Sequence, residues 1–300
     1  MPALTHITVC ICTFKRPPLL SRLLDELTRQ ETGGQLTYSI VVVDNDHLRS
    51  GESVVTDFGK SSPIAVRYCV EPQQNIARAR NRAVGNADGD FIAFVDDDEF
   101  PTQRWLLTLW ETLVEYKADG VLGPVKPHFD TEPPRWILEG KFHDRPADPT
   151  GMRLDWSRCR TGNVLLKREL FAQPAPPFRP ECLSGEDQDF FRRMIEQGHA
   201  FVWCNEAVVY EVVPPARWKR SFLIRRAVFR GIFSLRNNGF PPKRILQSVL
   251  AVPAYAAALP VMLVLGQAPF MKCVFKLSYH FGRLLALVGV NPISQPYVTD

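Results

Sequence analysis

The 300-residue chain lacks the features of several protein classes. It has no low-complexity tract or internal repeat, and 45% hydrophobic with 23% charged residues excludes disordered, collagen-like and mucin-like chains. Its seven cysteines include no C-x-x-C pair and several stand in apolar runs, which disfavours disulfides and structural zinc and favours a reducing compartment. The N-terminus has no basic stretch followed by an apolar one, so we expect no cleaved secretion signal.

Acidic residues are almost missing from the last third of the chain. Residues 212–300 hold twelve Lys and Arg but one acid, Asp300, which gives this segment a net charge of +11. Residues 1–211 carry a net charge of −7. The overall charge of +4 is therefore the sum of an acidic N-terminal part and a basic C-terminal part. The arginines of the basic part alternate with Phe, Leu and Ile at helical spacing. This spacing suits an anionic membrane surface better than nucleic acid, and we expect no nucleic-acid partner.

Charges are absent from Ser248 to Met271, a run of 24 residues, and about 20 suffice to cross a bilayer. Three prolines interrupt this run, and two lysines and an arginine follow it. A single crossing would place those three cations outside, against the usual bias. We therefore expect an interfacial or re-entrant segment, with a C-terminal hairpin packed on the soluble domain as the alternative. The prolines are Pro253, Pro260 and Pro269, and the cations are Lys272, Lys276 and Arg283.

Short β-branched or aromatic runs alternate with helical patterns in the rest of the chain, which predicts βαβ units and a mostly parallel sheet covered on both faces. The expected strands are Ile7–Cys12, Ser39–Val43, Ile64–Val70, Phe91–Val95, Gly120–Pro124, Phe201–Trp203 and Ala207–Val213. The expected helices are Leu19–Arg29, Ile76–Asn86, one opened by Pro101, and Glu186–Gln197. Residues 124–160 have little periodicity and predict a long functional loop.

Four consecutive acids, from Asp96 to Glu99, follow the strand Phe91–Val95. Such acids repel one another unless a cation lies among them, and ligands of open α/β sheets bind just beyond strand ends. In an extended chain Asp96 and Asp98 point to one side. Their hard oxygen atoms favour Mg²⁺ or Mn²⁺, ions that commonly bridge a protein to substrate phosphates. A solvated acidic turn is the alternative.

Several other motifs accompany this acidic cluster. The first two strands end in T-F-K-R-P and V-V-D-N-D, at the sheet edge where the acids are expected. A-R-N-R-A opens a helix, and G-E-D-Q-D-F-F-R-R opens another further along the chain. By itself the Glu186-Asp187 pair is explained by capping of the helix that follows.

Taken in order and spacing, these motifs together with G-D-F-I-A-F-V-D-D-D-E resemble family 2 glycosyltransferases of the GT-A fold over about residues 5–235. V-L-G-P-V-K-P-H-F, P-P-R-W and T-G-N-V-L-L-K-R are especially similar to bacterial β-1,4-glucosyltransferases of succinoglycan biosynthesis. The resemblance implies a Rossmann-like GT-A domain, and we place it at residues 1–211. A basic amphipathic region at 212–247 and a hydrophobic membrane-associated segment at 248–300 would follow.

The resemblance also implies roles for individual residues. The nucleotide would be held by Thr13, Phe14, Arg16, Asp44, Arg80, Asn81 and Asp96. Asp98, with Asp96, would bind the metal, and Asp187, with Glu186 beside it, would be the general base. Gly162 and Asn163 would line the donor sugar, with a turn as the alternative. Trp136 and Trp156 would stack on an acceptor sugar, with core packing as the alternative.

The sequence departs from the family at two points. Many relatives carry a metal-binding His after the last strand, where this chain has Tyr210 and Glu211; His199 is a third candidate. The Q-x-x-R-W motif of processive synthases is absent from the sequence, which favours addition of a single sugar.

The expected activity is inverting, metal-dependent transfer of a hexose. The donor would be UDP-glucose and the acceptor a polyprenyl-diphosphate-linked saccharide of exopolysaccharide or O-antigen biosynthesis, at the cytoplasmic face of the bacterial inner membrane. Inversion follows from one base with no second carboxylate nucleophile. A pyrophosphorylase would need a Gly-rich loop after the first strand, and Cys12–Pro17 contains no glycine. A catalytically silent membrane scaffold is the other alternative, against which the intact acids argue.

Overall fold

The computed structural model describes residues 4–172, 175–182, 185–236 and 240–289. The chain divides into two compact units, and we describe each separately. The first unit comprises Met1–Pro127 and Arg145–Val212, and the second comprises His128–Asp144 and Val213–Asp300. The last part of the expected segment 248–300, including Asp300, lies outside the described residues.

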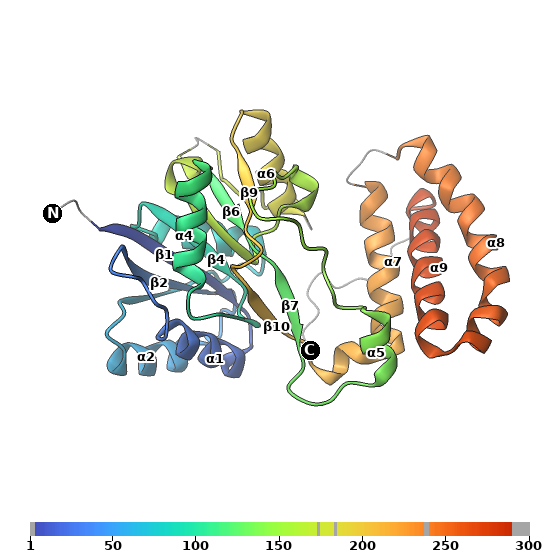
Figure 1. Cartoon of the computed structure of the whole chain (residues 1–300), viewed down its shortest axis with the longest axis horizontal. Helices are drawn as coiled ribbons and strands as arrows, with labels where there is room; N and C mark the ends of the chain where they lie inside the picture. Colours follow the sequence, from blue (N-terminus) through green and yellow to red (C-terminus); the bar gives the residue numbers. More distant parts are fainter. Residues whose placement is uncertain (1–3, 173–174, 183–184, 237–239, 290–300) are drawn as a thin grey trace. The chain divides into compact units, whose positions relative to one another are not determined.

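A seven-stranded sheet forms the centre of the described part of the first unit, in the order β3-β2-β1-β4-β8-β6-β9 (Figure 1). Neighbouring strands run parallel except at β8, which is antiparallel to both β4 and β6. The expected mostly parallel α/β sheet is thus confirmed. The strands are β1 (Thr5–Thr13), β2 (Leu36–Asp44), β3 (Val66–Val70), β4 (Phe91–Val95), β6 (Gly120–Leu122), β8 (Asn163–Lys167) and β9 (Phe201–Trp203).

Helices cover both faces of this sheet because its strands are apolar on both sides. Alternate residues of β1 show the two layers: Ile7, Val9 and Ile11 belong to the core formed with α1, α2 and α4, whereas Cys10 belongs to the core formed with α3 and α6. The helices are α1 (Pro17–Leu27), α2 (Glu52–Ser61), α3 (Ile76–Asn86), α4 (Trp105–Tyr116) and α6 (Glu186–Glu196).

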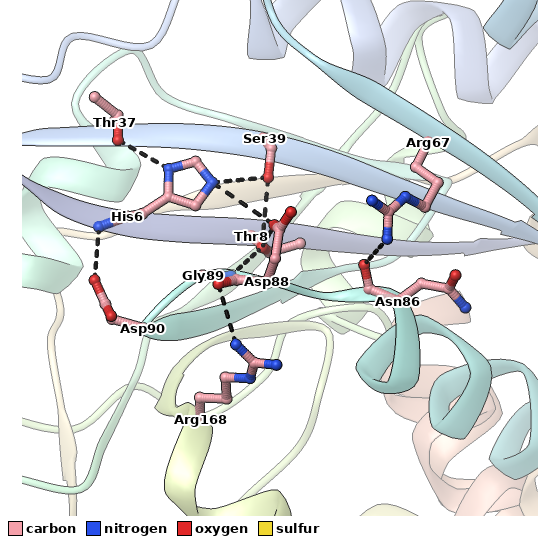
Figure 2. Close-up of polar contacts among 10 residues, drawn as sticks. All are labelled: His6, Thr8, Thr37, Ser39, Arg67, Asn86, Asp88, Gly89, Asp90 and Arg168. Carbon is pink, nitrogen blue, oxygen red and sulfur yellow. Dashed lines mark hydrogen bonds and ion pairs between the residues drawn. The ribbon is translucent and has the colours of Figure 1, made fainter.

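Polar contacts tie the strands together at the amino edge of the sheet (Figure 2). The His6 ring lies between two hydroxyls of β2, with Nδ1 2.8 Å from Thr37 Oγ1 and Nε2 3.0 Å from Ser39 Oγ. The turn before β4 is attached to β1 as well, since the Gly89 N–H donates to Thr8 Oγ1 at 2.9 Å. These contacts hold the strands together at this edge, whereas ligands of open α/β sheets bind at the carboxyl edge.

Gly89 lies so close to β1 that a side chain does not fit. A Cβ atom there would lie 2.6 Å from Thr8 N and 2.9 Å from His6 O, both backbone atoms. We expect Gly89→Ala to lower the free energy of unfolding by about 1–3 kcal/mol, as overpacking does. Gly85→Ala is the matched control, since a Cβ there meets nothing within 4 Å. Urea denaturation of both variants tests this, and equal stabilities would contradict it.

Two expectations need correction. Pro101 does not open a helix: it ends the short strand β5 (Glu99–Pro101), and α4 begins at Trp105. Proline is tolerated there because β5 is an edge strand of a three-stranded sheet, in the order β5-β10-β7. Residues 124–160 are not one long loop, since they contain β7 (Val125–His128), α5 (Arg135–Gly140) and η1 (Trp156–Arg158). The remaining strand is β10 (Val209–Val212).

Helices make up the second unit, where α9 lies between α7 and α8 (Figure 1). Helices α7 and α9 touch through glycines: a Cβ at Gly231 would lie 2.0 Å from Tyr279 O, and one at Gly282 would lie 2.2 Å from Val228 O. Within the described residues, α8 is the one helix long and apolar enough to cross a membrane. The elements are α5, η3 (Pro215–Trp218), α7 (Arg220–Arg236), α8 (Pro242–Leu265) and α9 (Gln267–Leu287).

Candidate active site

The carboxyl ends of β1 and β4 are joined by a charged cluster, as expected for adjacent parallel strands. Thr13 Oγ1 donates to Asp97 Oδ2 at 2.8 Å. Arg16 Nη1 donates to Asp97 Oδ1 at 3.1 Å and to Asp98 Oδ2 at 3.3 Å. Burial raises the pKa of Asp97 to about 6, and the Arg16 charge opposes that rise. Asp97, which the motifs left without a role, thus attaches the loop after β1 to the acids.

A buried arginine joins α3 to α6. Arg80 Nη1 donates to the Glu186 carboxylate, and Arg80 Nη2 lies 3.8 Å from Asp96 Oδ1. The side chains of Arg80 and Glu186 are only 9% and 8% exposed, whereas that of Asp96 is 45% exposed. Burial raises the pKa of Glu186, and the Arg80 charge opposes it. This bridge brings the N-terminus of α6 to the acids that follow β4.

Asp187 is the next residue of α6, and its carboxylate is placed differently. It is half-buried, and its Oδ1 accepts the N–H of Gln188 at 2.7 Å. Gly185, in the left-handed region at φ 82°, turns the chain into the helix. Among the described residues Asp187 forms no ion pair within 4 Å, in contrast to Glu186. Of this pair, Asp187 is the carboxylate left available to a substrate.

A third group of charges surrounds the turn between β4 and β5. Strand pairing places Glu99 opposite Glu211 of β10, and Arg145 forms an ion pair with Glu211. A Cβ at Gly162 would lie 2.9 Å from Glu99 Oε1 and 3.1 Å from Asp96 Oδ2, so the glycine leaves the acids uncovered. Gly162 is therefore at the acidic cluster, and its expected contact with the donor sugar stays a prediction. No sequence signal marked Arg145, because its partners lie far away along the chain.

A divalent cation fits the chemistry of this cluster. Glu99 Oε1 is buried without a hydrogen-bond partner, and burial raises the pKa of Glu99 well above its ordinary value. In the described part of the chain no three His, Cys, Asp or Glu side chains are arranged to hold a metal. The ion would thus take one or two carboxylates, from Asp98 and Asp96, and its other ligands from substrate phosphates and water, as Mg²⁺ usually does.

The three candidates for a further metal ligand lie in different places. His199 precedes β9 at the amino edge of the sheet, with Nδ1 3.4 Å from Asp119 Oδ2, so it is on the opposite side from the acids. Tyr210 stacks on Phe100, with ring centroids 5.5 Å apart. Glu211 is the one of the three placed opposite an acid of the cluster.

Asp44, expected at the nucleotide, is fully buried and already accepts several hydrogen bonds. Its Oδ1 accepts the Asp46 N–H at 3.0 Å, and its Oδ2 accepts the Gly51 N–H at 2.7 Å and the Tyr68 hydroxyl at 2.9 Å. These bonds fix the loop between β2 and α2. Asp44 therefore holds the wall of the expected nucleotide site in place.

Two other residues expected at the nucleotide also have protein neighbours. The Asn81 amide donates to Phe178 O at 2.7 Å and accepts the Phe178 N–H at 2.9 Å, which fixes the segment before α6 to α3. Phe14 is half-buried in the loop after β1, with Lys15 Nζ 5.1 Å from its ring centroid. Asn81 thus fixes the segment around Phe178 to α3.

Asn163 was expected at the donor sugar, but its amide is used within the protein. Its Nδ2 donates to Pro124 O at 3.0 Å and to Ala207 O at 2.7 Å, and its Oδ1 accepts the Trp105 Nε1–H at 2.8 Å. Since the residue is only 2% exposed, we assign it a structural role.

Loss of this amide should destabilise the first unit. Asn163→Ala leaves an indole N–H and two carbonyls without their partner, and each unsatisfied buried group costs about 1–3 kcal/mol. We expect the free energy of unfolding to fall by about 2–4 kcal/mol. Asn86→Ala is the control, because its amide makes an exposed bond to Arg82 O. Guanidinium denaturation compares them, and a loss at Asn163 no larger than at Asn86 would contradict the structural role.

The two tryptophans expected at an acceptor belong to different units. Trp136 lies in α5 of the second unit and packs on Phe142, with ring centroids 5.6 Å apart. Trp156 begins η1 in the first unit, where Gln188 Nε2 of α6 donates to Ser157 O at 3.2 Å. Trp156 is therefore held near the end of α6 that carries the acids.

Comparison with known proteins gives consistent matches. The model of the family described as glycosyl transferase family 2 matches residues 8–172, more than half of the chain. Succinoglycan biosynthesis protein ExoM of Rhizobium meliloti (strain 1021) is 29% identical over 297 residues, which cover 97% of this chain and 95% of that protein.

Solved structures share the GT-A fold. Mannosyltransferase PcManGT from Pyrobaculum calidifontis, in complex with GDP-Man and Mn²⁺, has a TM-score of 0.66 at 19% identity and covers 97% of this chain and 89% of that chain. S. aureus TarS 1-349, in complex with UDP-GlcNAc, has a TM-score of 0.54 at 16% identity, with 95% and 92% covered. At these identities the likeness concerns the fold.

Proposed function

The chain belongs to family 2 of the glycosyltransferases, and from this premise we propose that it is an inverting, metal-dependent hexosyltransferase of polysaccharide biosynthesis. The donor is UDP-glucose and the acceptor is a polyprenyl-diphosphate-linked saccharide. Similarity to ExoM along nearly the whole chain supports the pathway. The complexes of TarS with UDP-GlcNAc and of PcManGT with GDP-Man support a nucleotide-sugar donor. The apolar helix α8 and the basic residues around it support an acceptor carried by lipid.

The observation that carries the proposal is the Arg80 bridge. Arg80 pairs with Glu186 and lies 3.8 Å from Asp96, which supports a position for the neighbouring Asp187 carboxylate at the sheet edge of Asp96 and Asp98. Transfer needs a group that removes the proton of the acceptor hydroxyl and groups that stabilise the departing diphosphate. In this proposal the N-terminus of α6 supplies the base, and the carboxyl end of β4 supplies the acids that hold the cation.

The reaction follows from these positions. Asp187 takes the acceptor proton as the hydroxyl oxygen bonds to the anomeric carbon, while the bond from that carbon to the diphosphate oxygen breaks on the opposite face. The nucleotide diphosphate leaves with the electron pair, and the configuration inverts. Asp98 and Asp96 would hold the cation, which when bound offsets negative charge on the diphosphate. The Glu186 carboxylate is bonded to Arg80, so Glu186 positions Asp187 and does not take the proton of the acceptor hydroxyl.

Assays of the purified full chain with separate UDP- and GDP-sugars, Mn²⁺ and bacterial lipid extract test this function. We expect labelled glucose to enter the lipid fraction from UDP-glucose alone, and the new linkage to have the opposite anomeric configuration to the donor. Transfer from another nucleotide sugar would overturn the donor assignment. Donor binding without transfer to any lipid would favour a catalytically silent scaffold.

A further inference from the structure

The outward face of α8 is an apolar stripe, which we define as Leu246, Leu250, Pro253, Ala257, Val261 and Val264. These residues recur every three or four positions, so they share one side of the helix. All six are exposed, and the exposed fraction is 59–63% for Leu246, Leu250 and Val261 and 87% for Val264. The opposite side of α8 packs on α9. An exposed apolar stripe of this length marks a site that contacts another apolar surface or a membrane.

Backbone chemistry argues against burying this stripe in the hydrocarbon core. Pro253 and Pro260 lie inside α8 and have no N–H, so the carbonyls four residues earlier, at Val249 and Ala256, lose their helical partners. Both of these residues are exposed. In a bilayer core each unsatisfied carbonyl costs several kcal/mol, whereas in the headgroup region water reaches it.

Charges beside α8 argue the same way. The Lys276 ammonium of α9 lies 5.8 Å from the ring centroid of Tyr255, which is near the middle of α8. Lys276 and Lys272, one turn earlier, are both exposed. Because α9 contacts α8 along its length, a crossing by α8 would carry these ammonium groups into the membrane. On insertion scales each would cost about 2.5–3.5 kcal/mol at the centre.

We propose that α8 does not cross the membrane and that the stripe lies flat in the headgroup region of an anionic bilayer. The freed carbonyls are then hydrated, and the lysines of α9 stay in water beside acidic lipid headgroups. Lys243, exposed at the start of α8, adds a cation to the same helix. Both ends of the α8–α9 hairpin remain on one side of the bilayer. This inference rests on the proposed membrane location and is independent of the sugar and the acceptor.

Depth measurements along the stripe distinguish the two arrangements. Leu250→Trp, Ala257→Trp and Val264→Trp are each bound, as full chains, to phosphatidylcholine vesicles with phosphatidylglycerol. The lipid chains are brominated either near the headgroup or near their ends, and the unsubstituted chain gives the background fluorescence. We expect all three positions to be quenched most by the shallow bromines and to the same extent. Deep quenching at Ala257 with shallow quenching at the other two would mean a crossing and overturn the inference.

Binding measurements separate this failure from loss of the membrane location itself. We expect Leu250→Asp and Val264→Asp to weaken vesicle binding by about tenfold or more, because each removes apolar contact and adds a charge that acidic lipid repels. Val114→Asp, the same kind of change on an exposed residue of α4, is the matched control and should bind normally. If the unsubstituted chain bound neither anionic nor neutral vesicles, the membrane location would be wrong as well.

Discussion

Replacing Asp187 with asparagine is expected to lower the rate of sugar transfer by about a hundredfold to ten-thousandfold, the usual contribution of a general base. Asparagine keeps the size of the side chain and the acceptor oxygen that bonds to the Gln188 N–H. It cannot take a proton from the acceptor hydroxyl. Since Arg80 still holds Glu186, we expect the fold and donor binding to persist, apart from about 0.3–1 kcal/mol of lost charge–dipole stabilisation at the helix end.

Asp189→Asn provides the matched control on the same helix. The Asp189 carboxylate is paired with Arg192 and Arg193, at 3.1 and 2.9 Å, so its charge is already compensated within the protein. We expect this variant to lose stability and to retain transfer. Single-turnover rates with UDP-sugar, together with donor binding by calorimetry, separate the two effects. If Asp187→Asn turned over like the unsubstituted chain, or Asp189→Asn were the inactive one, the base would be another residue.

The sequence pattern predicted the helices and strands correctly where a single hydrophobic periodicity dominated a segment. Ile76–Asn86 is a helix with the predicted bounds, and Phe91–Val95 is a strand with the predicted bounds. The pattern failed where tertiary pairing decided the outcome. Pro101 is in a strand because Val209 pairs with it. Helix α2 buries only Val55 and Phe58, which is too little periodicity to predict it.

The site was predictable in its place but not in its internal bonds. Motifs at strand ends marked the carboxyl edge, since parallel strands bring their ends together. They could not reveal that Arg80 pairs with Glu186, which is 106 residues away, or that Thr13 bonds Asp97 across 84 residues. Arg145 could not be identified from the sequence for the same reason. Assigning a partner to each carboxylate requires the three-dimensional structure.

Asp98→Asn is the second change with a large expected effect. We expect transfer to fall by about a hundredfold to a thousandfold, because a weaker ligand at the cation site leaves charge on the departing diphosphate less stabilised. Arg16 also bonds Asp97, so the loop after β1 keeps its attachment and the loss should concern catalysis. Calorimetric titration of Mn²⁺ in the presence of UDP should show weakened binding to the variant, which distinguishes loss of the cation from misfolding.

Removal of the metal gives an independent measure of the same site. EDTA should abolish transfer by the unsubstituted chain, and Mn²⁺ or Mg²⁺ should restore it, whereas added metal should only partly rescue Asp98→Asn. Asp57→Asn is the matched control, because Asp57 is an exposed acid of α2 paired with Lys60 at 2.9 Å. Full activity of Asp98→Asn in EDTA would mean that Arg16, Arg80 and Arg145 provide the positive charge that the diphosphate needs, and the acids at the end of β4 would then serve to orient these arginines.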